Sequence, residues 1–107
     1  MDNLLADLPR RLDAEEVVEL VRRGDVRIER IVSTGQATPE DEPYRQDHDE
    51  WVLLLAGAAR VWLDGRGERT LAPGDAILIP AGTMHRVAWT DPDEPTVWLA
   101  VHFGGDT

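Results

Sequence analysis

The sequence predicts an all-β domain, an antiparallel sandwich or barrel, preceded by one short α-helix. Short apolar runs of strand length follow one another from residue 26 to residue 103, with turn residues between them. The segment Asp64-Gly65-Arg66-Gly67, between two of these runs, is a hairpin signal. Only the stretch from 12 to 24 has the apolar spacing of an amphipathic helix. We therefore expect an N-terminal extension and helix over 1–25, a barrel over 26–103 and a frayed tail over 104–107.

The stretch from 12 to 24 predicts the helix by its ends as well as by its apolar stripe. Asp13 and Glu16 have the spacing of a capping box, and Gly24 suits the position just after a last helical turn. The apolar stripe consists of Val17, Leu20 and Val21. We expect this helix to pack on the domain or on a second copy of the chain.

The expected strands are short and evenly spaced. They cover residues 26–33, 50–55, 60–63, 68–71, 76–79, 85–89 and 96–103. Some of them, such as 50–55, are apolar on both faces, which indicates a second packed layer or a partner subunit. A homodimer is therefore expected.

Composition excludes several classes of function. The 107 residues carry a formal charge of -10, which disfavours nucleic acid as a partner. No cysteine is present, so disulfides and thiolate metal sites are excluded. No apolar run has the length of a membrane span, and the first residues carry acids where a signal peptide would carry bases. We expect a cytoplasmic protein without a membrane partner.

The stretch from Gly74 to His85 is the most informative part of the chain. A Pro-Gly-Asp turn opens it, an apolar strand follows, and Pro80 and Gly82 make a second turn. His85 then stands at the start of the next strand. A small barrel would present a ligand to its cavity at such a position.

Here the sequence resembles the cupin superfamily, whose members are double-stranded β-helix (jelly-roll) barrels. Gly74, Pro80, Gly82 and His85 stand at the spacing of the second cupin motif. The first motif is degenerate: Glu50 and Gly57 keep its Glu-to-Gly spacing, but the two positions that hold histidines in the family are Tyr44 and Gln46. The resemblance covers the barrel region and implies the fold of a small single-domain cupin.

The resemblance also implies a metal site, because two His, one Glu and the His of the second motif bind a divalent metal in the family. Only Glu50 and His85 match these ligand types, and Gln46 could offer an amide oxygen. His48 could replace the missing imidazole, or it could lie on an exposed acidic loop. Two imidazoles and one carboxylate would suit Fe, Mn, Zn, Ni or Co. Residues that could line the cavity without binding the metal are Tyr44, Trp89 and His102.

Two functions remain open at this point. One is a metal-dependent protein that binds or acts on a small polar metabolite. The other is a metal-free binding or sensor module without catalysis, which the degenerate first motif favours. The cupin fold hosts both kinds of protein, so the fold leaves the choice open.

Overall fold

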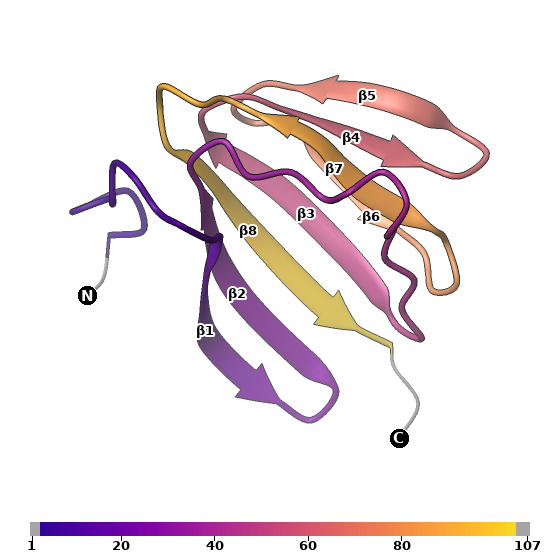
Figure 1. The fold of residues 1–107 in the computed structure, drawn as a ribbon. Helices are drawn as coiled ribbons and strands as arrows, with labels where there is room; N and C mark the ends of the chain where they lie inside the picture. Colours follow the sequence, from indigo (N-terminus) through magenta and orange to yellow (C-terminus); the bar gives the residue numbers. More distant parts are fainter. Residues whose placement is uncertain (1–2, 105–107) are drawn as a thin grey trace.

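The computed structural model describes residues 3–104 and consists of two antiparallel sheets that face each other (Figure 1). The five-stranded sheet has the order β1-β2-β8-β3-β6, and the three-stranded sheet has the order β5-β4-β7. The strands are β1 (Glu16–Arg23), β2 (Val26–Ser33), β3 (Asp49–Ala56), β4 (Ala59–Leu63), β5 (Gly67–Leu71), β6 (Ala76–Ile79), β7 (His85–Thr90) and β8 (Thr96–Phe103). The prediction of an all-β sandwich or barrel is confirmed, and the strands predicted between 26 and 103 all form.

The predicted N-terminal helix is wrong, because most of this stretch is strand β1. β1 pairs with β2 from Glu16↔Val32 to Arg23↔Val26, so that Gly24 and Asp25 form a two-residue hairpin turn. Gly24 has φ +55°, which suits glycine in such a turn. The β-branched valines of β1 lose side-chain freedom in a helix and favour a strand. The Gly-Asp pair was thus a hairpin signal, and not a helix end.

β1 is an edge strand with an unusually apolar exposed surface. Its large apolar side chains are all more than a third exposed: Val17, Val18, Leu20 and Val21. The tail predicted over 104–107 lies, apart from Gly104, outside the described residues. Within the described part of the chain, no helix is long and apolar enough to cross a membrane.

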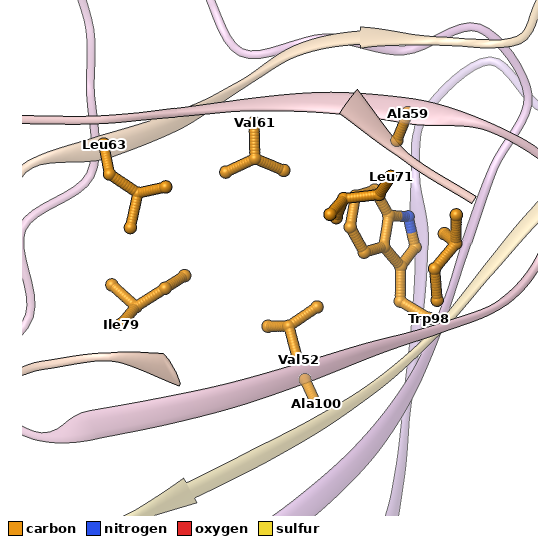
Figure 2. Close-up of a cluster of buried hydrophobic side chains, with 9 residues drawn as sticks. Val52, Ala59, Val61, Leu63, Leu71, Ile79, Trp98 and Ala100 are labelled. Carbon is orange, nitrogen blue, oxygen red and sulfur yellow. The ribbon is translucent and has the colours of Figure 1, made fainter. Parts of the chain in front are cut away.

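The core lies between the two sheets. Val52, Ile79, Trp98 and Ala100 of the larger sheet face Val61, Leu63 and Leu71 of the smaller one (Figure 2). Leu54 and Leu63 are at most 1% exposed, and truncation of such a leucine to alanine costs about 2–5 kcal/mol. Gly57, with φ +88°, lies so close to Thr96 that a Cβ would stand 2.6 Å from its Cα. The turn between β3 and β4 therefore needs glycine at this position.

The segment between β2 and β3 closes one side of the sandwich by running along the free edge of β7. Thr38 donates its amide to the carbonyl of Val87, and Tyr44 exchanges both backbone hydrogen bonds with His85. Further along, Gly82 donates its amide to the carbonyl of Gln46. These contacts place the degenerate first motif directly beside the second motif.

Candidate functional site

The space between the sheets contains a cavity of about 230 Å³ with one polar end. Its polar lining consists of Glu15, Glu29, Tyr44, Gln46, Glu50, His85 and His102. Its apolar lining consists of Val17, Ile31, Val52, Val61, Leu71, Ile77, Ile79, Val87 and Trp98. The cavity can therefore hold a small molecule that is apolar over most of its surface and polar at one end.

Glu50 stands in the middle of the polar end because of strand register. It pairs with His102 of β8 on one side and with Ile79 of β6 on the other. His102 in turn pairs with Arg27 of β2. Residues opposite each other share a face of the sheet, so these side chains form one row. Glu50 is 8% exposed and His102 is 7% exposed.

On one flank of Glu50, Gln46 and His85 are connected by hydrogen bonds. The Gln46 amide nitrogen lies 2.8 Å from Glu50 Oε1 and 3.4 Å from His85 Nε2. His85 Nδ1 lies 3.0 Å from the carbonyl oxygen of Thr83 and donates to it. An amide nitrogen only donates, so His85 Nε2 accepts from Gln46. The two amide hydrogens of Gln46 thus satisfy one carboxylate oxygen and one imidazole nitrogen.

On the other flank, His102 lies between the carboxylates of Glu29 on β2 and Glu50 on β3, and it also contacts the imidazole of His48. Its Nε2 lies 3.1 Å from Glu29 Oε1 and 3.9 Å from Glu50 Oε2. Its Nδ1 lies 2.8 Å from Nε2 of the half-buried His48. A carboxylate only accepts, so His102 donates at Nε2 to Glu29, and in the neutral form of His102 the Nδ1 atom accepts from His48. Burial lowers the pKa of His102 and favours this neutral state, although the Glu50 charge acts in the opposite direction.

Glu15 reaches the cavity from the residue before β1. Its Oε2 accepts a hydrogen bond from Ser33 Oγ at 3.0 Å, and Ser33 accepts from Trp98 Nε1 at 3.2 Å. The residue as a whole is exposed, but its carboxyl group points inward to a fully buried serine. Burial raises the pKa of the Glu15 carboxyl, and the charges of Glu50 and Glu29 act in the same direction against the Ser33 hydrogen bond.

The structure brings most of the sequence-predicted site residues together, and it places two elsewhere. Glu50, His85, Gln46, Tyr44 and His102 line the cavity. His48 lies outside this lining, because a bend at 47–48 interrupts the extended segment before β3.

Trp89 lies on the other face of its strand from His85. Arg60 pairs with Trp89 and Val61 pairs with Val87, so the register shifts by one residue between them. This bulge reverses the alternation that would have turned Trp89 inward. The Arg60 guanidinium lies 5.0 Å from the centre of the Trp89 ring.

Sequence reasoning missed two carboxylates of the site, Glu15 and Glu29. Glu15 was assigned to a helix, and the Gly24-Asp25 hairpin signal could have corrected this. Glu29 and Arg27 alternate with Val26 and Ile28, and in a half-buried sheet such a polar face is turned to solvent. No local signal in the sequence identifies its face as the inner one.

The donor set does not fit the metal that the resemblance implies. Among residues 3–104, no three His, Cys, Asp or Glu side chains are arranged to hold a metal ion. The Gln46 amide presents hydrogens to Glu50 and His85, and the reverse orientation would put two oxygens 2.8 Å apart. The remaining position of the implied set is Tyr44, which is 54% exposed.

Comparison with known proteins agrees with the fold. Residues 30–102 match the family model described as cupin domain. A crystal structure from Ralstonia eutropha, of a protein provisionally described as a mannose-6-phosphate isomerase, is 44% identical with a TM-score of 0.94 and covers 98% of both chains. A cupin superfamily protein from Desulfitobacterium hafniense is 19% identical with a TM-score of 0.78, over 99% of this chain and 92% of that one.

Other similar structures show how varied the proteins with this fold are. A DMSP lyase from Ruegeria pomeroyi is 23% identical with a TM-score of 0.72, over 86% of this chain and 48% of that one. A search of the curated proteins found no match to the sequence. The distant likenesses support the fold alone, but the family model spans more than half of the sequence, and the chain therefore belongs to the cupin superfamily.

Proposed function

We propose that this cupin binds a small organic molecule in its cavity without the help of a metal ion. The observation that carries the proposal is the Gln46 amide, which donates to Glu50 and to His85 at once. These two groups are the only matches to the implied ligand types at the motif positions, and each already has a protein partner. The apolar lining supplies the surface on which a small molecule would be bound.

A phosphorylated sugar is a poor candidate for the ligand, although the similar protein from Ralstonia eutropha carries a provisional description as a mannose-6-phosphate isomerase. Three glutamates line the cavity, and none of its lining residues is an arginine or a lysine. A phosphate ester would meet carboxylates without a cation to pair with, which disfavours its entry. We infer that the ligand of this cavity is not an anion.

A divalent metal is the second candidate, because Glu50 faces two imidazoles. Its Oε1 lies 3.9 Å from His85 Nε2, and its Oε2 lies 3.9 Å from His102 Nε2. Two imidazoles and one carboxylate are a suitable donor set for Fe, Mn, Zn, Ni or Co. This candidate requires the Gln46 amide to leave its place between Glu50 and His85.

Metal analysis and thermal unfolding distinguish the two candidates. We expect protein purified without a histidine tag to carry far less than one metal ion per chain, and added divalent ions to leave its Tm unchanged. Stoichiometric metal that is lost on His85→Ala would contradict the proposal. Small organic molecules that bind should raise the Tm as their concentration rises.

The expected homodimer stays a prediction. β1 lies at the edge of the larger sheet (Figure 1), and its exposed apolar side chains are a surface that such an association would cover. Light scattering coupled to gel filtration measures the state directly, and Val18→Lys should shift a dimer toward monomer.

A further inference from the structure

We propose that the ligand is a small organic ammonium ion, with its charged head at the glutamates and its apolar body against the apolar lining of the cavity. This inference rests on the proposed metal-free function and names the chemical class of the ligand.

Two carboxylates from different strands meet at the polar end of the cavity, next to His102 Nε2, and a third, Glu15, lines the cavity where Ser33 donates to it. Glu50 comes from β3, Glu29 from β2, and Glu15 from the residue before β1. The side chains of Glu50 and Glu29 are 11% and 14% exposed. Carboxylates that are removed from water in this way need a cation or hydrogen-bond donors.

Glu50 has one oxygen without a donor. Oε1 accepts from Gln46, whereas no described residue donates a hydrogen bond to Oε2. The nearest imidazole nitrogen, His102 Nε2, lies 3.9 Å from Oε2 and donates to Glu29 instead. Because Glu50 is 8% exposed and lines the cavity, this free oxygen points to a donor or a cation that the ligand brings.

The protein neutralises only part of this negative charge. Arg27 Nε lies 3.0 Å from Glu29 Oε2 and pairs with that carboxylate. Neither imidazole donates to the free oxygen of Glu50, because His85 Nε2 faces the Gln46 amide and His102 Nε2 donates to Glu29. One ammonium head, with three N–H donors, could serve Glu50 Oε2 and still reach a neighbouring carboxylate.

The rest of the cavity selects an apolar body. Its remaining lining is apolar and includes Val52, Val61, Leu71, Ile77, Val87 and Trp98. A bare inorganic cation would leave these walls without a contact, and a strongly hydrated body would lose its water there. A compact hydrocarbon ring or branched chain with one ammonium group matches both ends of the cavity.

Three probes of the same shape test the inference by isothermal titration calorimetry at pH 7, in a buffer without amines. They are cyclohexylammonium, cyclohexanol and cyclohexanecarboxylate. We expect the ammonium ion to bind at least tenfold more tightly than the alcohol, and the carboxylate not to bind. Glu50→Gln keeps the shape of the side chain and should weaken ammonium binding at least tenfold. Glu68→Gln removes an exposed carboxylate on β5 that does not line the cavity, and it should leave binding unchanged.

The outcomes separate the ligand class from the underlying function. Equal affinity for the ammonium ion and the alcohol, together with no effect of Glu50→Gln, would contradict the inference that the ligand is a cation. It would not contradict the proposal of metal-free binding. Absence of ammonium binding at millimolar concentration would also contradict the inference that the ligand is a cation. If no probe binds and a divalent metal stabilises the wild-type chain, the proposed function itself fails. Circular dichroism and the Tm of Glu50→Gln check that the variant is folded.

Discussion

The two flanks of Glu50 are held in different ways. On the flank of β7, His85 is fixed by the carbonyl of Thr83 and by the Gln46 amide, and Gln46 is itself anchored through its backbone to Gly82. On the flank of β8, His102 is fixed only by side chains, the carboxylate of Glu29 and the imidazole of His48. A hydrogen-bond partner from the backbone remains in place after most substitutions. A hydrogen-bond partner from a side chain is lost when that side chain is replaced.

This difference assigns separate tasks to the two flanks. On the flank of β7, both ring nitrogens of His85 and the amide nitrogen of Gln46 have protein partners, so this flank shapes the cavity without needing a ligand. The flank of β8 keeps the carboxylates of Glu29 and Glu50 close together, and only Glu29 has a cationic partner there, Arg27. We infer that electrostatic effects on folding and on binding originate mainly at the flank of β8.

The largest expected effect is on stability when each imidazole is removed in turn. His102→Ala leaves the half-buried Glu29 with one partner fewer and His48 without its hydrogen-bond partner, so it should lower the free energy of unfolding by about 3 kcal/mol. His85→Ala leaves Gln46 bonded to Glu50 and should cost about 1 kcal/mol less. Urea denaturation of both variants at pH 7 measures the difference.

The reverse order of the two losses in unfolding free energy would contradict this comparison between the flanks. If His85→Ala costs as much as His102→Ala or more, the backbone anchor of His85 does not make its flank the more tolerant one. An unchanged m-value in both variants is the control that the transitions remain comparable.

The next effect concerns metal binding on the flank of β7. Gln46→His places an imidazole beside Glu50 and His85, which makes a donor set of two imidazoles and one carboxylate. We expect Zn²⁺ or Ni²⁺ to stabilise this variant by about 2.7 kcal/mol at a hundredfold excess over its Kd. The wild-type chain should not respond. Thermal unfolding with and without metal measures both.

Gln46→Ala is the matched control for the stabilisation of Gln46→His by metal. It removes the amide without adding a ligand, so metal should not stabilise it. Stabilisation of the wild-type chain and of Gln46→His to the same extent would show that the amide does not prevent metal binding.

The flank of β7 could largely be predicted from the sequence, because its signals are local. Pro80 and Gly82 fix the turn that delivers His85, and the positions of Gln46 and Glu50 followed from motif spacing. The strands between 26 and 103 were recognisable because turn residues separate them. Such signals come from residues that are adjacent in the sequence, so they can be recognised without the structure.

The flank of β8 could not be predicted, because its contacts depend on strand pairing. His102 meets Glu29 and Glu50 only because β8 lies between β2 and β3. Because a helix was predicted where β1 forms, Glu15 was not recognised as a cavity residue. The apolar spacing in such a short segment fits a helix as well as an edge strand. The bend at 47–48 and the bulge before Trp89 altered side-chain directions that simple alternation predicts wrongly.

The smallest expected effect is the pH dependence that Glu15 adds at the mouth of the cavity. Burial raises the pKa of this carboxyl from its ordinary value of 4.5, so the folded state holds the proton more tightly than the unfolded state. Its contribution to stability is present below pH 4.5 and is lost as the pH rises through the folded pKa. Glu15→Gln should therefore gain stability relative to wild type as the pH rises, by less than about 1 kcal/mol at pH 7 because the side chain is partly exposed. Urea denaturation from pH 4 to pH 7 measures this difference, and Glu94→Gln, at an exposed position in the turn between β7 and β8, should show none of it. If the two variants follow the same pH profile, burial does not raise the pKa of the Glu15 carboxyl.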